Sequence, residues 1–289
     1  MRTAPPRGPA GPRPAVVVLV VGTGTDVGKT WVAARLLEAW RGAGLSVAAR
    51  KPAQSYAEGA GPTDAEVLGA ASGENPAAVC PPAQSYPVAL APPMAADALG
   101  VTPPTVADLV AAVAWPQPGP GRGAGGGAGG GAGAGAGVGV SVGLVETAGG
   151  VRSPQADDGD AVDVGAALQP DWVVLVADAG LGTVNAVRLS LAALTDVGGP
   201  GPAPLVPVVV LNRFDASSDL HRRNLAWLRD RDGVQVVAAT SEELADLAGR
   251  VAPHPAGGLY EPPARRARSS RLSWRRARRV ALRSGPPST

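Results

Sequence analysis

The sequence predicts an α/β fold in which a parallel sheet carries helices on both faces. Short apolar runs rich in valine and leucine alternate along the chain with segments of helical character, which is the pattern of crossover units on a parallel sheet. The runs are nearly continuous in apolar residues, as expected for strands covered on both faces. With 289 residues, 45% of them hydrophobic, the chain is long enough for one large domain or two small ones with a real core.

Six strands and six helices are expected in chain order. The strands are predicted at residues 15–21, 45–50, 138–146, 172–178, 205–211 and 234–239. The helices are predicted at residues 28–41, 63–72, 105–115, 183–196, 220–230 and 241–251. In the first helix the apolar residues recur at helical spacing and so share one face: Val32, Leu36, Leu37 and Trp40.

Three segments depart from this pattern. Residues 1–14 are rich in proline, lack a cleavage pattern, and are interpreted as a disordered leader instead of a signal peptide. Residues 117–137 are almost entirely glycine, alanine and proline, which indicates a flexible low-complexity insertion. Residues 253–289 are interpreted as a basic, disordered tail, the alternatives being a segment that binds an anionic surface or a misread frame. Residues 15–252 are then a single domain.

Charge is distributed unevenly along the chain. Nine of the 26 basic residues are arginines within residues 265–289, which hold no acid, so the preceding 264 residues carry 17 basic and 24 acidic side chains. The formal net charge of +2 therefore hides an acidic body and a basic tail. Nucleic acid is not expected as a partner, because a module built on the tail leaves residues 22–150 unexplained.

The chain has one cysteine, Cys80, which excludes an intramolecular disulfide and suits a reducing cytosol. No apolar stretch approaches the roughly 20 residues that span a bilayer, so a cytoplasmic protein is expected. His221 and His254 have no ligand-like partners and are interpreted as surface residues. Four aspartates resemble a calcium loop but lack the downstream glutamate. They are interpreted as a solvated loop: Asp157, Asp158, Asp160 and Asp163.

A glycine-rich turn directly follows the first predicted strand. It reads Gly22-Thr23-Gly24-Thr25-Asp26-Val27-Gly28-Lys29-Thr30. Backbone N–H groups at the start of the following helix point at a bound phosphate, and the helix dipole adds to their pull. Lys29 would reach the terminal phosphates and the Thr30 hydroxyl would bind Mg²⁺. An ordinary strand-to-helix turn is the alternative, and the Gly-Lys-Thr triplet in this context disfavours it.

Lysine is rare in this chain, which has 24 arginines and two lysines. Lys29 lies in the glycine-rich turn, and Lys51 ends the second apolar run, just before Pro52. Lysine presents a rotatable point charge and arginine a rigid fork, so the two are not interchangeable at a crowded phosphate. Both lysines are therefore expected in the chemistry.

The loop departs from the standard spacing, because five residues instead of four separate Gly22 from Gly28. In this form it resembles the dethiobiotin synthetases, whose loop reads Gly-Thr-x-Thr-x-Val-Gly-Lys-Thr. Residues 22–30 match every fixed position. The resemblance extends over about residues 15–215 and implies a parallel-sheet P-loop nucleoside triphosphate hydrolase fold, helices on both faces.

Further segments are similar to other elements of that family. Residues 51–55 are similar to an element whose lysine and following serine line the substrate site, and Asp64 falls where the family places a metal-binding aspartate. Residues 145–150 are similar to its Val-Glu-Gly-Ala-Gly-Gly segment, in which Glu146 matches the acid that holds Mg²⁺ and Thr147 replaces a glycine. The family's proline-containing loop falls at residues 86–93, and its dimer-interface turn at 181–185.

The resemblance implies a complete set of site residues. The catalytic residues are Lys29, Lys51, Thr25 and Ser55. ATP would be bound by Gly24, Thr25, Asp26, Val27, Gly28, Lys29, Thr30, Glu146 and Asn212. Mg²⁺ would be held by Thr30, Asp64 and Glu146. The substrate would contact Lys51, Ser55, Gly149, Gly182, Thr183, Val184 and Asn185.

The reaction implied is the closure of 7,8-diaminopelargonic acid with CO₂ into a cyclic urea, driven by ATP through a carbamate and its phosphoric anhydride. Lys29, Lys51 and the metal would offset the repulsion between carbamate and triphosphate. The substrate's distant carboxylate would rest on backbone N–H groups of residues 182–185 from a partner subunit. A homodimer is therefore implied.

Several of these residues also have simpler interpretations. Asp64 after Thr63 fits a plain helix cap, whereas Glu146 in an apolar layer is costly without a partner such as Mg²⁺. The Asn212 to Asp215 segment resembles the Asn-Lys-x-Asp box that selects guanine. The family's asparagine at this strand end contacts adenine instead, and that reading is favoured for Asn212, with Asp215 leaving the base open.

The strongest rival is a dimeric ATPase switch of the partitioning type, which has the same fold and acts through protein partners. Its members have a signature lysine five residues before the loop lysine, where this chain has Gly24. An amidotransferase-linked cobyrinate-type synthetase is a second rival, but this chain has no second half with a glutaminase cysteine. The preferred nucleotide and the effect of Thr147 stay open.

Overall fold

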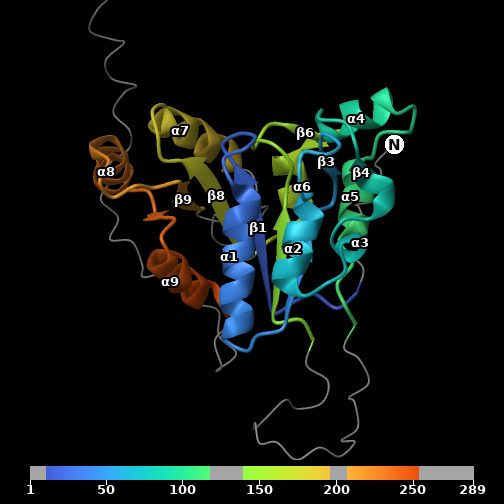
Figure 1. Ribbon diagram of the computed structural model, residues 1–289, viewed down its shortest axis with the longest axis horizontal. Coiled ribbons are helices and arrows are strands. Elements are labelled where there is room, and N and C mark those ends of the chain that lie inside the picture. The colour runs from blue at the N-terminus through green and yellow to red at the C-terminus, as the bar shows by residue number, and fades with distance from the viewer. Residues whose placement is uncertain (1–10, 118–138, 196–206, 254–289) are drawn as a thin grey trace, which may run out of the picture.

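A six-stranded parallel sheet forms the centre of the protein (Figure 1). The computed structural model describes residues 11–117, 139–195 and 207–253. The strand order is β10-β9-β8-β1-β5-β2. The strands are β1 (Val16–Gly22), β2 (Val47–Arg50), β5 (Val142–Glu146), β8 (Trp172–Asp178), β9 (Val208–Asn212) and β10 (Val236–Ala238). All six predicted strands are confirmed. Strand β8 starts at the predicted residue, and β1, β2, β5 and β10 start one to four residues later than predicted.

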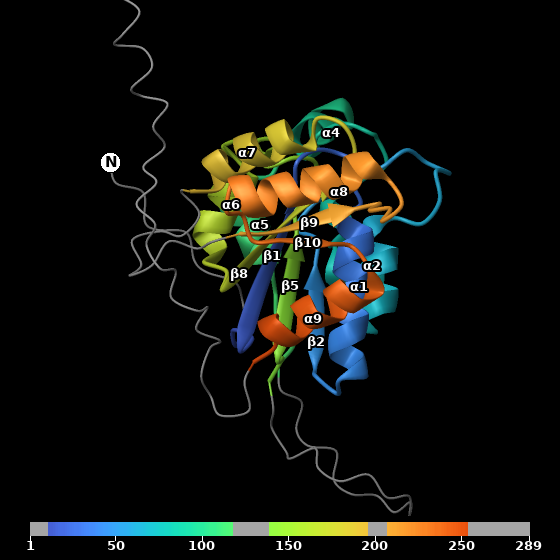
Figure 2. The ribbon, with the colours of Figure 1, turned by 90° about the vertical axis from the view of Figure 1, so that its left-hand side faces the viewer.

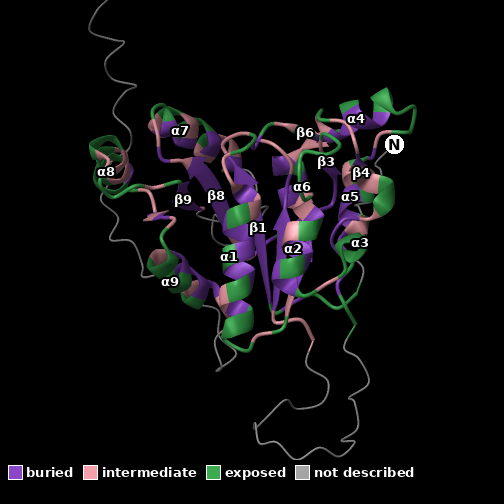
Figure 3. Ribbon diagram, in the orientation of Figure 1, coloured by how far each residue is buried: buried purple, intermediate pink, exposed green. Residues whose placement is uncertain are grey.

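The strands are apolar on both faces because both faces are covered. In β1, Val17, Leu19 and Val21 pack into one hydrophobic cluster. Their neighbours Val16, Val18 and Val20 pack into the cluster on the opposite face, as the two-residue repeat of a strand requires. Figure 3 shows the resulting buried strands between helices that expose only their outer sides.

Helices cover the two faces in separate groups, as predicted. Helices α1, α2 and α9 pack on one face, and α5, α6 and α7 on the other (Figure 2). The long helices are α1 (Lys29–Gly42), α2 (Asp64–Ser72), α6 (Ala161–Leu168), α7 (Thr183–Leu194), α8 (Asp219–Ala226) and α9 (Ser241–Val251). Shorter helices are α3 (Pro76–Val79), η1 (Pro82–Gln84), α4 (Pro92–Ala98), α5 (Val106–Ala112) and the π-helical turn η2 (Trp227–Arg231). Two small ribbons pair β3 (Gln54–Ser55) with β4 (Ser85–Tyr86) and β6 (Pro154–Ala156) with β7 (Gly159–Asp160).

Two segments interpreted as loops contain helices. The aspartate-rich stretch starts α6: the Asp160 side chain accepts hydrogen bonds from the backbone N–H groups of Val162 and Asp163, in a capping box. The solvated-loop interpretation is therefore wrong for Asp160 and Asp163, whereas Asp157 and Asp158 lie in an exposed turn as expected. The proline-containing loop holds α4, whose first residues are Pro92 and Pro93, because proline fits the first helical turn, where its missing N–H has no intrahelical partner anyway.

The three segments that depart from the α/β pattern lie mostly outside the described residues. Most of the leader 1–14, nearly all of the insertion 117–137 and nearly all of the tail 253–289 lie there. Within the described part of the leader, Arg13 donates a hydrogen bond of 2.7 Å to Asp171, whose Oδ2 also accepts from the Val17 backbone at 2.7 Å. Residues 11–14 thus contact the domain. No helix among the described residues is long and apolar enough to cross a membrane.

The topology positions one end of the sheet for ligand binding. Strands β5 and β8 flank β1 on its two sides, and all six strands run in parallel, so their carboxyl ends share one edge. The chain leaves β1 through α1 and returns at β2, beyond β5. In open α/β sheets, ligands bind outside the carboxyl ends of the strands at such a reversal of strand order.

Candidate active site

A pocket of about 760 Å³ opens at the carboxyl ends of the central strands. It contains residues from the glycine-rich loop, from the segment that follows β2, from the start of α2 and from the end of β5. The predicted site residues that line it are Thr25, Asp26, Gly28, Lys29, Thr30, Lys51, Ser55, Asp64, Glu146 and Gly149. The structure therefore brings together predicted site residues from segments that are far apart in the sequence.

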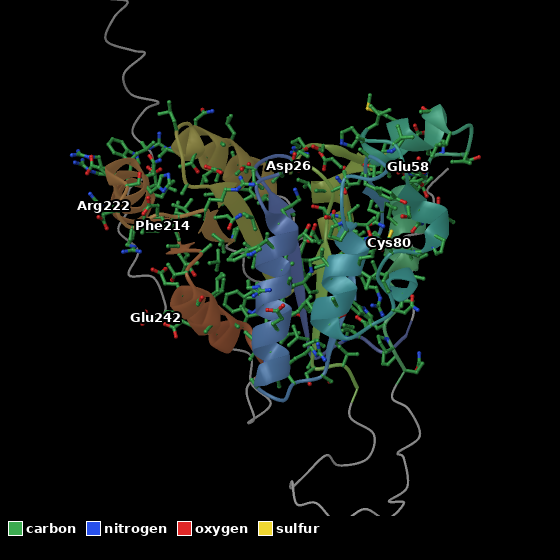
Figure 4. The ribbon with its side chains drawn as sticks, in the orientation of Figure 1. Asp26, Glu58, Cys80, Phe214, Arg222 and Glu242 are labelled. Carbon is green, nitrogen blue, oxygen red and sulfur yellow. The ribbon has the colours of Figure 1, made fainter. Side chains whose placement is uncertain are left out.

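The glycine-rich loop has the geometry of a phosphate cradle. Gly28 precedes α1 with φ 88°, in the left-handed region, which glycine adopts without a steric penalty. A Cβ atom at Gly28 would lie 1.9 Å from Asn212 Nδ2, so the loop is also closed against the end of β9. Lys29 Nζ donates to the Gly24 carbonyl at 3.0 Å across the loop. Figure 4 labels Asp26, which lies in this loop above α1.

Lys51 lies between two carboxylates at the buried end of the pocket. Its Nζ is 2.6 Å from Glu146 Oε1 and 2.7 Å from Asp64 Oδ2. Lys51 and Glu146 are almost completely buried. Burial alone lowers the pKa of Lys51, but attraction by Glu146 and Asp64 outweighs it and raises that pKa above its ordinary value. The two carboxylates therefore favour the charged form of Lys51.

Lys29 has the opposite shift. Burial, followed by repulsion from Lys51, lowers the pKa of Lys29 to about 8. The two lysines thus differ in environment although both line the pocket. The structural reason is that both carboxylates contact the ammonium group of Lys51, whereas Lys29 donates only to a backbone carbonyl in this structure.

Thr30, Asp64 and Glu146 meet in a way that suits a divalent cation. The Thr30 hydroxyl lies 2.8 Å from both Asp64 Oδ1 and Glu146 Oε1, but it has one proton and donates to only one of them. Glu146 Oε2 is buried without a hydrogen-bond partner. Burial raises the pKa of Glu146, which is the expected response of a carboxylate lacking sufficient positive charge. These oxygens fit Mg²⁺, which needs only one or two protein carboxylates.

The described residues hold no group of three or more histidine, cysteine, aspartate or glutamate side chains arranged for a metal.

The start of α2 is fixed by residues around Asp64. Thr63 is the N-cap, and it forms a capping box with Glu66. Asp64 is the first helical residue and its side chain turns to Thr30 and Lys51, so its interpretation as a plain helix cap is wrong. Gln54 Oε1 accepts from the Ala65 backbone at 2.9 Å, which ties this turn to the segment that follows Lys51.

Other predicted residues have clear positions. Ser55 lines the pocket and donates to the Leu90 carbonyl at 2.5 Å. Gly149 has φ 61°, and a Cβ there would lie 2.6 Å from Ser153 Oγ. Thr147 is buried, its hydroxyl is 3.5 Å from the Val20 carbonyl, and it does not line the pocket. The glycine-to-threonine difference is therefore accommodated inside the domain.

The turn at residues 182–185 does not line this pocket. It starts α7, and the preceding Leu181 is 92% exposed. Asn212 does not line the pocket either, but its Nδ2 donates to the Val27 carbonyl at 3.0 Å. Asp215 Oδ1 accepts from both the backbone and the hydroxyl of Ser217, so this carboxylate is engaged in its own turn.

Gln54 and Arg213 are two of the pocket residues that were not predicted as site residues. Gln54 closely follows Lys51 in the sequence and is buried. Its position as a polar residue next to a predicted site residue could have suggested that it belongs to the site. Arg213 stands in the lysine position of the Asn-Lys-x-Asp pattern, but its contact with the glycine-rich loop depends on the fold.

The comparisons with known proteins agree with this site. Residues 17–111 match a protein family described as AAA domain. The chain is 35% identical to the ATP-dependent dethiobiotin synthetase BioD of Anaeromyxobacter dehalogenans, over 74% of this chain and 86% of that protein. The chain belongs to the dethiobiotin synthetase family. Its member from Haloferax mediterranei is 35% identical over 75% of this chain and 80% of that protein, and the one from Caulobacter vibrioides is 33% identical over 69% and 81%.

Membership of the dethiobiotin synthetase family fits the elements described. The relatives are named ATP-dependent dethiobiotin synthetases, and the glycine-rich loop from Gly22 to Thr30 is consistent with ATP-dependent activity. Among solved structures, the chain is similar to the signal recognition particle receptor FtsY of Elizabethkingia anophelis, with a TM-score of 0.43, 14% identity and coverage of 83% of this chain and 67% of that one. Similarity at that level carries no information about function.

Proposed function

We propose that this protein is a dethiobiotin synthetase that closes 7,8-diaminopelargonic acid with CO₂ into dethiobiotin, converting ATP to ADP and phosphate. The observation that carries this proposal is the placement of Lys51 beside the glycine-rich loop, buried between Glu146 and Asp64. A fixed buried cation next to a phosphate site is what a reaction between two anions needs.

The first chemical step joins an amine of the diamine to CO₂ and releases a proton, giving a carbamate anion. This anion must approach the triphosphate, which has the same sign of charge. Lys29 and Lys51 both line the pocket and lower the resulting repulsion. The protein supplies position and charge here, with no acid–base pair required.

In the next step a carbamate oxygen attacks the γ-phosphorus and ADP leaves, which gives a carbamic–phosphoric anhydride. Charge spreads over the transferring phosphoryl group, and Lys29 stabilises it from the loop. The second amine then attacks the carbonyl carbon, loses a proton and expels phosphate. Thr25 and Ser55 line the pocket and would orient the carbamate and the amines by hydrogen bonds.

Mg²⁺ would be held by Thr30, Asp64 and Glu146, and when bound it would neutralise charge on the phosphate oxygens. Asn212 would contact the adenine through Oδ1, since its Nδ2 is used by the Val27 carbonyl. Asp215 Oδ1 accepts two hydrogen bonds from Ser217. Because this oxygen is already engaged, the geometry supports adenine over the guanine that an Asn-Lys-x-Asp aspartate would bind.

We further propose a homodimer in which residues 182–185 complete the substrate site of the partner subunit. The first N–H groups of a helix lack intrahelical partners and attract a carboxylate. In the structure Thr183 Oγ1 is buried without a hydrogen-bond partner, while the adjacent Leu181 is exposed. Both features support a surface that is completed by a second copy.

The test is product detection by mass spectrometry. The protein would be mixed with diaminopelargonate, bicarbonate, Mg²⁺ and each nucleoside triphosphate in turn. Dethiobiotin is expected with ATP, and ADP should form only when the diamine is present. ATP hydrolysis that proceeds freely without the diamine, with no product, would count against the synthetase and favour an ATPase switch.

A further inference from the structure

Arg213, directly after β9, bridges the glycine-rich loop and the end of β8. Its Nη2 donates to the Asp26 carbonyl at 2.6 Å, and its Nη1 donates to Asp178 Oδ2 at 2.9 Å. The Asp26 carbonyl belongs to the loop that surrounds the phosphates, and Arg213 itself lines the pocket. None of the roles proposed above uses this arginine.

The contact joins two residues with unusual backbone conformations. Among the described residues, only three that are not glycine have a positive φ, and Asp26 (57°) and Arg213 (53°) are two of them. The left-handed conformation is unfavourable for residues with a Cβ atom, and such conformations persist where surrounding contacts hold them. The hydrogen bond between these two residues is such a contact.

A second donor acts on the neighbouring carbonyl. Asn212 Nδ2 donates to the Val27 carbonyl at 3.0 Å, so the last residue of β9 and the residue after it bind two successive carbonyls of the loop. The fit is close, because a Cβ atom at Gly28 would lie 1.9 Å from Asn212 Nδ2. The end of β9 therefore determines the path of the loop from Asp26 to Gly28.

The loop needs this support because it has one residue more than the standard pattern between Gly22 and Gly28. An extra residue adds conformational freedom, which must be lost when the backbone N–H groups converge on a phosphate. In a trans peptide the C=O and the following N–H point in opposite directions. Hydrogen bonds that hold the carbonyls of Asp26 and Val27 therefore also fix the direction of the N–H groups of the two residues that follow.

We propose that Arg213, oriented by Asp178, is a positioning residue that holds the lengthened glycine-rich loop in its phosphate-binding conformation. Asp178 is suited to this task, because its Oδ1 accepts from the Gly180 backbone at 2.7 Å while Oδ2 accepts from Arg213. The carboxylate is thereby fixed on one side and orients the guanidinium on the other. Replacing Arg213 therefore reduces nucleotide affinity without removing any group that touches the reacting atoms.

The test compares Arg213→Ala, Arg213→Lys and Asp178→Asn with the wild type. Calorimetry with ADP and with a non-hydrolysable ATP analogue, each with Mg²⁺, gives affinities that do not depend on the reaction. Arg213→Ala is expected to weaken both ligands equally, by about five- to tenfold, the effect of one lost charge-assisted hydrogen bond. Arg213→Lys keeps one donor and should recover part of the loss, and Asp178→Asn should show about a two- to threefold loss.

The kinetic arm rests on the proposed function and predicts a raised KM for ATP with kcat within about twofold. The control is Arg223→Ala, which removes another exposed arginine paired with an aspartate, Asp219, at 2.6 Å. Exposed ion pairs contribute little to stability, so the melting temperatures of all variants should stay close to that of the wild type.

Unchanged affinities in Arg213→Ala would overturn the proposal. A loss of affinity confined to the ATP analogue would also overturn it, because that result indicates direct contact with the γ-phosphate. If the wild type forms no dethiobiotin, the proposed function fails while the binding arm still tests the loop.

Discussion

Lys51 and Lys29 show how the same residue type acquires two roles from its surroundings. Lys51 is enclosed by two carboxylates outside the glycine-rich loop, whereas Lys29 lies inside that loop and donates to Gly24. The first arrangement keeps a cation at a fixed point beside the substrate, and the second keeps it within reach of phosphates. Loss of either lysine should therefore affect different steps.

We expect Lys51→Gln to lower product formation by about 100-fold or more, because a preorganised charge at the reacting centre is lost. Its affinity for ADP should stay within about threefold of the wild type, since the loop is intact. The glutamine amide has no charge to balance Glu146, and a lower melting temperature is expected because this buried carboxylate loses its counter-ion. Isothermal calorimetry and product assays on Lys29→Gln and Lys51→Gln give the comparison. Equal losses of nucleotide affinity in both variants would contradict this division.

Cys80 offers a test of burial that is independent of catalysis. Burial raises the pKa of its thiol to about 12, because the thiolate is disfavoured in an apolar environment. Only the thiolate reacts with iodoacetamide. Between pH 7 and pH 10 we expect very slow alkylation of the native protein and rapid alkylation in urea, where the pKa returns to about 8.5. Mass spectrometry measures the extent of alkylation. Rapid modification of the native protein would show that the segment around Cys80 is open.

At the scale of elements, helix α2 links local capping to the site. Thr63 and Glu66 form its capping box, and the next residue after the cap is the pocket residue Asp64. Helix α5 has the same kind of cap, made by Thr105 and Asp108, outside the pocket. The two helices thus form a matched pair in which only one cap positions a site residue.

Replacing Thr63 or Thr105 by alanine should each destabilise the protein by about 1 kcal/mol and lower the melting temperature by about 2–4 °C. Only Thr63→Ala should also raise the Mg²⁺ concentration needed for half-maximal nucleotide binding, because it loosens the turn that carries Asp64. Calorimetry and Mg²⁺ titrations of both variants separate these effects. A raised Mg²⁺ requirement in Thr105→Ala as well would indicate a general loss of stability instead.

The sequence was sufficient for the elements with regular patterns. Apolar runs rich in valine and leucine predicted all six strands of the sheet. The motifs predicted that Lys51, Asp64 and Glu146 belong to one site, where the structure brings their side chains together. Helix α6 was missed because its aspartates are equally typical of a loop until their capping bonds are known. The contact of Arg213 with Asp26 depends on two positive φ angles in residues that seldom adopt them, so sequence patterns gave no indication of it.

At the scale of the whole molecule, exposed apolar residues lie on α7 and just before it. Leu181 is 92% exposed and Leu189 is 66% exposed. A side chain as apolar as leucine at the head of the proposed substrate turn is consistent with a partner subunit that covers it. The substrate site and the oligomeric state are then linked.

Leu181→Asp is expected to give a monomer in sedimentation experiments, because a charge is costly in an apolar interface. Its affinity for ADP should be unchanged, while the KM for the diamine should rise at least about tenfold as the partner's turn is lost. Leu220→Asp is the control, since Leu220 is also exposed but lies on α8. A dimer that persists with unchanged kinetics would contradict the proposed shared site.

The described residues that follow the insertion at residues 117–137 lie at the start of β5, at the end of the sheet opposite the pocket. Just after the insertion, Ser46 Oγ donates to the Gly139 carbonyl at 3.1 Å and the Ser141 backbone donates to Ser46 at 2.9 Å, at the start of β5. A gene divided between residues 127 and 128 would encode one fragment with Lys51 and another with Glu146. Because β5 lies between β1 and β2, the second fragment must insert a central strand into the first before the pocket exists. Diamine-dependent ADP formation would then occur only after the two fragments are mixed, which would make the enzyme a reporter of fragment association.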